Sequence, residues 1–397
     1  MYLIRRGVPI LGLVLAMAGS AAAQDQGSTR VVISGFAMMD MGYQTKQNDP
    51  AWFDVLRPTK LPSSKDEFGT EGRFFASVRQ SRLGVQSFTS TAVGELFTNF
   101  EFDMYGTGAD AGQTTIRLRH AWGQLGKFGA GQTLTPFMDI DMFPNSIEYW
   151  GPNGMVFFRN VQLRYTPFDK DGSNLQIALE RPGASGDQGA DSNRVQLAGI
   201  QARFPLPDLS MHYRRATSFG HVQVAGILRY MAWDDNAADT LGGSATGWGV
   251  NLTTNVKLGP HILRAGVVYG EGIENYMNDA PVDVGVRNDG GNLFGEALPV
   301  IGVSAFIDLN WNEKYTSTIG YSRVQITNSN GQALDAFRTG EYALANLLVH
   351  PLPNMFFGPE IQWGQRVNNR DSFKSNDVRV QFSAKYNFKQ QFGGNAP

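Results

Sequence analysis

The stretch that decides the fold is DVRVQFSAKYNF, residues Asp377–Phe388. Every second residue is apolar, and the apolar set ends in Tyr386 and Phe388, whereas the alternate residues are polar and include Arg379 and Lys385. Strict alternation places the two sets on opposite faces of a β-strand. An apolar face that ends in aromatic residues, opposite a face that carries cations, is typical of a wall with lipid outside and water inside. The stretch therefore predicts a membrane-spanning strand.

The N-terminal residues predict export. Arg5 and Arg6 precede the short apolar run Val8–Ala18, and the small residues Ala21 and Ala23 follow it. This order is that of a secretory signal peptide and is too short for a membrane helix. We expect residues 1–23 to be removed after Ala23, leaving residues 24–30 as a short polar leader.

Composition narrows the class of the exported chain. The 397 residues include no cysteine, which excludes disulfides, thiolate metal sites and a catalytic thiol. Beyond the signal peptide there is no run of about 18 apolar residues, so no transmembrane helix is expected. The formal net charge of −2 argues against a nucleic-acid partner.

Alternating segments recur along the whole mature chain, as in Glu95–Tyr105 and Thr114–Leu125, and tight turns alternate with long connections. We interpret Arg73–Phe88 as one strand, and we place Arg194–Phe204 inside a long outer loop as a short helix. This count predicts an all-β fold, a transmembrane antiparallel β-barrel of about sixteen strands, with short periplasmic turns and longer outer loops. The barrel domain covers residues 31–388, and residues 389–397 form a C-terminal tail. A soluble β-sandwich has the same alternation, but charges in the middle of the strands and aromatics near their ends favour the membrane.

The longest aromatic-rich connection is Thr135–Phe158, TPFMDIDMFPNSIEYWGPNGMVFF. The lumen of a barrel of about sixteen strands is a wide channel unless something narrows it. Three prolines stiffen this segment and its aromatics can pack it against the wall. We expect it to fold inward as a constriction, with a surface loop as the alternative.

Carboxylates in this segment suggest two readings. Asp139, Asp141 and Glu148, together with Asn145, could be calcium ligands, but the spacing lacks the central glycine and terminal glutamate of an EF-hand loop. We interpret them as lumen-facing acids and expect no metal and no cofactor.

Many arginines share the predicted lumen face. Guanidinium groups bind carboxylates bidentately, and charged rings set the ion preference of a pore. The same face carries the acids Glu101, Asp103 and Glu360, so the lumen is expected to favour anions or to orient dipolar solutes. The arginines on this face are Arg82, Arg117, Arg119, Arg164, Arg214, Arg229, Arg366 and Arg379; Arg159 has an ambiguous parity.

Signs of catalysis are weak. The five histidines are scattered, and none lies in an H-E-x-x-H or G-x-S-x-G context. We therefore expect no enzyme. A barrel hydrolase stays open as an alternative, because its catalytic groups would come from several strands.

Four stretches together resemble the DcaP-like outer-membrane porins, and the likeness spans nearly the whole mature chain. They are RQSRLGVQS (Arg79–Ser87), RLRHAWGQLGKFGAGQTLTPF (Arg117–Phe137), FPNSIEYWGPNG (Phe143–Gly154) and RNVQLRYTP (Arg159–Pro167). General porins share parts of these patterns, so a non-selective porin is a second alternative.

The resemblance implies a homotrimeric diffusion channel in the bacterial outer membrane, surrounded by lipid and lipopolysaccharide. It implies small anionic solutes, dicarboxylates among them. It also implies that Thr135–Phe158 is the inward loop and that Arg82, Arg119, Arg159 and Arg164 contribute to a cationic constriction.

Overall fold

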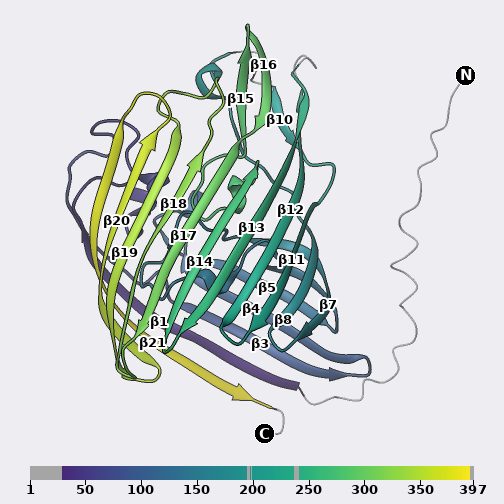
Figure 1. Ribbon diagram of the computed structural model, residues 1–397, viewed down its shortest axis with the longest axis vertical. Helices are drawn as coiled ribbons and strands as arrows, with labels where there is room; N and C mark the ends of the chain where they lie inside the picture. Colours follow the sequence, from purple (N-terminus) through teal and green to yellow (C-terminus); the bar gives the residue numbers. More distant parts are fainter. Residues whose placement is uncertain (1–28, 195–196, 198, 237–240, 394–397) are drawn as a thin grey trace, which may run out of the picture.

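The computed structural model describes residues 29–194, 197, 199–236 and 241–393, so the predicted signal peptide lies outside the described residues. The last strand, β21 (Lys374–Phe392), pairs antiparallel with the first, β1 (Thr29–Gln44), from Val31 opposite Phe392 to Gln44 opposite Arg379. This pairing closes the sheet into a barrel (Figure 1). Strand β21 runs four residues beyond the expected end at Phe388, because the first residues of β1, Val31–Ser34, supply backbone partners for Lys389–Phe392. Residues 29 and 30 of the expected leader and residues 389–392 of the expected tail thus belong to these two strands.

The wall has the predicted sixteen strands. The main sheet contains 18 segments, of which β2 and β3 share one wall position and β10 only extends the upper edge. The wall strands are β1, β2 (Arg73–Ser77) with β3 (Arg82–Thr91), β4 (Gly94–Tyr105), β5 (Thr114–Leu125), β6 (Phe128–Leu134), β7 (Arg159–Lys170), β8 (Ser173–Glu180), β11 (Asp208–Thr217), β12 (Gly220–Asp235), β13 (Gly243–Leu258), β14 (His261–Glu271), β17 (Pro299–Asn310), β18 (Tyr315–Ile326), β19 (Phe337–Leu352), β20 (Met355–Asn368) and β21.

Burial along β21 distinguishes the outer face of the wall from the lumen face. Val380 and Tyr386 are each 49% exposed, whereas Arg379 and Gln381 are fully buried. In a soluble sandwich the apolar parity would be the buried one. Here the apolar residues lie on the outside of a closed wall, which suits lipid, and the polar residues point into the lumen.

The expected strand Arg73–Phe88 is interrupted, which corrects the sequence interpretation. A turn separates β2 from β3, with the backbone N–H of Ser81 donating to the carbonyl of Val78 at 3.0 Å. The side chain of Arg79 enters the lumen there and forms an ion pair with Asp54 at 2.6 Å. Alternation alone could not predict the break, because the partner carboxylate lies in a distant loop.

Short turns gather at one rim of the barrel and long loops at the other, as predicted. Figure 1 shows the end of β21 at the lower rim and the hairpin β15–β16 projecting from the upper rim. The segment Arg194–Phe204 was expected to contain a short helix. Instead, its described part contains strand β10 (Ile200–Arg203), which pairs with the upper end of β12 because that end extends beyond its neighbour β11. The other loop strands are β9 (Gly186–Asp187), β15 (Val284–Asp289) and β16 (Asn292–Ala297).

The described helices are single 3-10 turns inside the loops. Within the part of the chain that the structure describes, no helix is long and apolar enough to cross a membrane. The turns are η3 (Pro50–Trp52), η4 (Pro58–Lys60), η5 (Gly108–Asp110), η6 (Ile140–Met142), η7 (Gly189–Asp191) and η9 (Glu274–Tyr276).

Three outer loops concern the site: L1 (residues 45–72), L3 (residues 135–158) and L6 (residues 272–298). L3 and L6 enter the lumen together. Val156 of L3 forms a β-bridge with Met277 of L6, and the N–H of Phe157 donates to the carbonyl of Tyr276 at 3.0 Å. Phe137 and Ile273 from these loops are fully buried in an apolar cluster against the inner wall. The barrel thus has a core inside its lumen, made by its own loops.

Candidate functional site

Wall carboxylates hold the tip of L3 across the lumen. The N–H groups of Ile147 and Glu148 donate to the two carboxylate oxygens of Glu360 on β20, at 3.0 and 3.2 Å. The N–H of Asn145 donates to Asp308 on β17 at 3.1 Å. Backbone N–H groups in a loop lack ladder partners, and charged acceptors bind them strongly. L3 therefore folds inward, as expected from its sequence.

A second set of contacts joins L3 to L1 and L6. The guanidinium of Arg57 in L1 lies against the rings of both Trp52 and Trp150, 4.2 and 3.9 Å from their centroids. Its Nη2 also forms an ion pair with Asp279 of L6 at 2.8 Å. Ring contacts and charge pairing together fix the planar guanidinium of Arg57, so this residue connects the three loops L1, L3 and L6.

Between these loops and the wall lies a cavity of about 680 Å³, here called the central cavity. Strands β3, β5, β7 and β21 form one side of it, and L3 and L6 form the other. Its volume is within the range of small-molecule sites, about 300–1,000 Å³. The cavity is thus wide enough for a small solute and is bounded by the inward loop.

One side of the central cavity is cationic. Five cations on the wall strands contact it, and we call them the cationic wall: Arg82, Arg117, Arg119, Arg159 and Lys385. A sixth cation at the cavity, Arg57 of L1, is paired with Asp279.

Two carboxylates neutralise part of the cationic wall. Glu101 accepts from Arg119 Nε at 2.6 Å and lies 3.6 Å from Arg82 Nη1. Asp103 binds Arg117 Nη2 at 2.7 Å and Arg119 Nη1 at 2.8 Å. Five cations against two carboxylates leave three positive charges in excess.

The remaining carboxyl groups at the cavity add little opposing charge. Burial and the neighbouring Asp283 raise the pKa of Glu274 well above its usual range, which favours the neutral form of this L6 carboxyl. Burial also raises the pKa of Glu148 on L3 to about 7, against Arg379 and backbone N–H groups that lower it. Both shifts reduce the negative charge that these two carboxyls set against the cationic wall.

Two arginines of the cationic wall keep unused donors. Arg82 Nε, Arg159 Nε and Arg159 Nη2 are buried and have no hydrogen-bond partner among the described residues. Arg159 otherwise stacks on Phe157, with its guanidinium carbon 4.8 Å from the ring centroid. Unpaired buried donors are costly, and an anionic ligand or water would satisfy them.

The model of the DcaP outer membrane protein family matches residues 60–388, which is most of the chain. The chain belongs to the DcaP outer membrane protein family. A search of curated proteins found no match.

Solved structures agree with this DcaP-family assignment in their fold. The crystal structure of the outer membrane channel DcaP of Acinetobacter baumannii aligns with a TM-score of 0.76 at 21% identity, covering 91% of this chain and 97% of that chain. An anion-selective porin from Comamonas acidovorans aligns at 0.59 and 9% identity, covering 91% and 100%. OmpT of Vibrio cholerae, in its trimer form, aligns at 0.54 and 12% identity, covering 91% and 100%. The predictions of family, barrel fold and outer-membrane location are confirmed.

Two arginines expected at the constriction of this DcaP-family barrel lie elsewhere. Arg164 donates from Nε to Gln162 at 3.0 Å and packs on Trp122. Arg366 donates to the carbonyl of Asp335 at 2.8 Å and to that of Thr59 at 3.3 Å, so it joins outer loops. Neither lines the central cavity. Strand parity predicts the face of a residue but not its height in the lumen.

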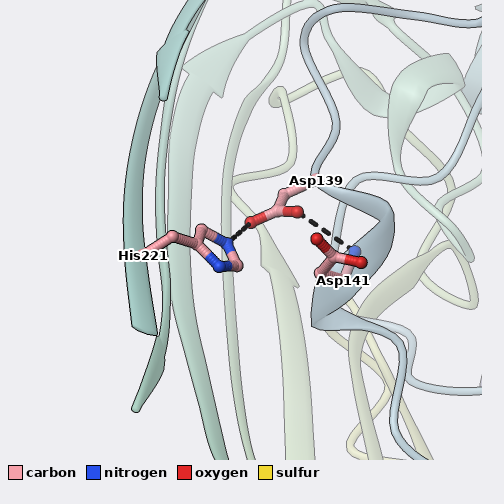
Figure 2. Close-up of side chains that lie close together, drawn as sticks. All are labelled: Asp139, Asp141 and His221. Carbon is pink, nitrogen blue, oxygen red and sulfur yellow. Dashed lines mark hydrogen bonds and ion pairs between the residues drawn. The ribbon is translucent and has the colours of Figure 1, made fainter. Parts of the chain in front are cut away.

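Asp139 and Asp141 also do not line the central cavity. Figure 2 shows His221 reaching from β12 to Asp139, with Asp141 beside it on L3; the His221 Nε2 to Asp139 Oδ2 distance is 2.7 Å. Ligand atoms of these three residues lie within 4.8 Å of one another, which could suit a metal ion. However, Arg214 binds Asp141 at 2.5 Å and lies 3.5 Å from Asp139, so its guanidinium already supplies the positive charge that a metal ion would bring to these two carboxylates. The cluster fastens L3 to the wall.

The sequence did not indicate Arg57 at the central cavity, and for Tyr149 it predicted only that this aromatic packs L3 against the wall. Tyr149 donates from its hydroxyl to Asp103 at 2.5 Å and so joins L3 to the cationic wall. Both residues lie in long loops, where no periodic pattern indicates direction. The inward direction of Lys385 could have been predicted, because this residue belongs to the polar set of alternate residues on the last strand.

The high pKa of Glu148 makes the stability of the protein depend on pH. A carboxyl whose pKa rises from 4.5 to about 7 on folding binds more protons in the folded state, so stability falls as pH rises through this window. The full difference amounts to about 3 kcal/mol. We expect Glu148→Gln to remove this part of the pH slope, so that the variant gains on the wild type between pH 4.5 and 7. Melting temperatures of both proteins across this window would test it, and parallel curves would contradict it.

Proposed function

We propose that this chain is a passive outer-membrane diffusion channel that favours small anionic solutes, organic acids such as dicarboxylates among them. The observation that carries the proposal is the cationic wall, with three positive charges in excess and free donors on Arg82 and Arg159. Guanidinium groups suit carboxylates because two parallel N–H bonds match the two oxygens. The Comamonas porin of the same fold is anion-selective, which supports the proposal by analogy. Family membership favours a channel over the hydrolase.

Selectivity measurements test this proposal through Arg82 and Arg159. The double variant Arg82→Gln/Arg159→Gln removes two excess charges, while Glu101 keeps its bond to Arg119. One charge about 6 Å away in water is worth roughly 0.7 kcal/mol, or about threefold in local anion concentration. We therefore expect the anion-to-cation permeability ratio to fall by up to about tenfold, measured as the reversal potential across planar bilayers at low salt.

Arg366→Gln is the matched control, since it removes a lumen arginine outside the central cavity. Its reversal potential should stay near that of the wild type. Equal shifts in both variants would reject the cationic wall as the selective element. A wild type with no anion preference would instead favour the general, non-selective porin.

We propose further that the channel is a homotrimer. OmpT of Vibrio cholerae, which shares the fold, has been solved in a trimer form. Light scattering of the purified protein in detergent would test this, and a monomeric mass would refute it without affecting the selectivity proposal.

A further inference from the structure

The side of the central cavity that L3 and L6 form carries a group of apolar side chains. Ile140 is 44% exposed, although it lies on a loop that folds into the lumen, and it lines the cavity. The ring centroids of Phe143 and Phe157 are 5.6 Å apart, so these two side chains form one continuous surface. We call this surface the apolar strip, and its residues are Ile140, Phe143, Phe157, Phe158 and Ala280.

The loops fix the apolar strip in place. Phe157, Phe158 and Ala280 pack against the buried apolar cluster of the lumen core and also line the cavity. The ring of Phe143 packs on Gly151, where L3 turns with a φ of +80° and where a β-carbon would lie 2.5 Å from that ring. A surface that is already ordered loses little conformational entropy when a solute covers it.

Most polar side chains on the same side of the cavity already have partners. Asn278 donates to the carbonyls of Trp150 and Pro152 at 2.7 and 2.8 Å. The side-chain oxygen of Asn275 accepts from the hydroxyl of Ser185 at 2.9 Å. The apolar strip is therefore the main surface that L3 and L6 offer to the body of a solute.

The apolar strip adjoins the cationic wall. The guanidinium carbon of Arg159 lies 4.8 Å from the ring centroid of Phe157, so a cation of the wall touches an aromatic ring of the strip. A charged group held against the strip would lose its water without gaining a partner, whereas the wall offers guanidinium groups to a carboxylate. The central cavity thus complements a molecule with a carboxylate at one end and an apolar body at the other.

We propose that the channel selects among small anions by their carbon body and favours carboxylates that carry a compact apolar ring. The carboxylate lies against the cationic wall and the ring against the apolar strip. This inference rests on the proposed function, because it needs the anion preference that the cationic wall supplies. The strip adds a selection that charge alone cannot make, since hydroxylated acids carry the same charge.

Competition with chloride in planar bilayers, on the full folded protein, tests this selection. The probes are benzoate and threonate, which are similar in size and carry one carboxylate each, but have an apolar and a hydroxylated body. We expect benzoate to halve the chloride current at a concentration about tenfold lower than threonate, because only its ring gains from contact with the strip.

Three variants assign the preference to the apolar strip. Ile140→Asn removes apolar surface at an exposed position, and the ratio of the two half-blocking concentrations should fall about threefold. Ile140→Leu keeps the apolar surface and should keep the ratio. Leu334→Asn is the matched control, since Leu334 is 60% exposed in another outer loop and does not line the cavity. Comparing ratios removes any change in basal conductance from the result.

The outcomes separate this inference from the proposed function. A wild type that prefers anions but responds equally to benzoate and threonate would overturn the inference and leave the proposed function intact. An unchanged ratio in Ile140→Asn, or an equal fall in Leu334→Asn, would reject the apolar strip as the selective surface. A wild type without any anion preference would reject the proposed function, and this inference with it.

Discussion

Replacing the tip of L3, residues 144–152, with a glycine–serine segment of equal length should raise single-channel conductance severalfold. The replacement removes the side chains of Tyr149 and Trp150, and with them the bond to Asp103 and the stack on Arg57. A glycine–serine segment behaves as a flexible coil, so it would no longer be fixed across the lumen. A barrel of sixteen strands leaves an aqueous channel when nothing obstructs it. Conductance in planar bilayers is the measurement.

The exposed tip of the β15–β16 hairpin offers the control for this replacement. Residues 289–292 lie at the upper rim, away from the central cavity, and the same exchange there should leave conductance unchanged. If the L3 variant conducts like the wild type, L3 is not the constriction. If its anion preference also disappears, the loop positions the cationic wall as well as narrowing the lumen.

Arg79→Leu is expected to lower the free energy of unfolding by about 3–5 kcal/mol, the usual cost of breaking a buried ion pair from one side. The Arg79 side chain is 1% exposed and pairs with Asp54 at 2.6 Å. It also donates to the carbonyls of Gly106 and Gln113 at 2.9 and 3.0 Å. Its removal leaves a buried carboxylate and two loop carbonyls without their cation. Denaturant titration of the protein folded into vesicles would measure the loss.

An exposed pair supplies the matched control for Arg79. Lys46 and Glu71 lie 2.8 Å apart, with their side chains 48% and 54% exposed. Water already solvates both charges, so Lys46→Ala should cost less than about 1 kcal/mol. Comparable losses in the two variants would contradict the role assigned to Arg79, which is to hold L1 and the β2–β3 break against the wall.

Much of the fold could be predicted because alternation is a local property. The parity of β21, with Val380 outward and Arg379 inward, holds in the structure because successive side chains of any strand point to opposite faces. The break at Val78–Ser81 could not be predicted in this way. It depends on Asp54, which is 25 residues from Arg79 along the chain and becomes its neighbour only when L1 folds inward.

In the candidate site, too, the face of a residue could be predicted but its long-range contacts could not. Arg82, Arg117 and Arg119 lie on the predicted face and line the central cavity. Arg164 and Arg366 share the predicted face but bind backbone carbonyls elsewhere, of Leu134 at the end of β6 and of Asp335 in an outer loop. L6 was expected only as a long outer loop, yet its bridge to L3 makes it half of the lumen core.

The sequence by itself predicted a closed, lipid-facing wall with a charged interior. A period of two residues indicates strands with one apolar face, charges in the middle of the strands favour a membrane over a sandwich, and every backbone group in hydrocarbon must be paired. Only the tertiary structure decided which interior charges meet at one cavity. That outcome depends on the paths of L1, L3 and L6, and these paths are set by contacts between residues far apart in the chain, such as Arg57 with Asp279 and Ile147 with Glu360.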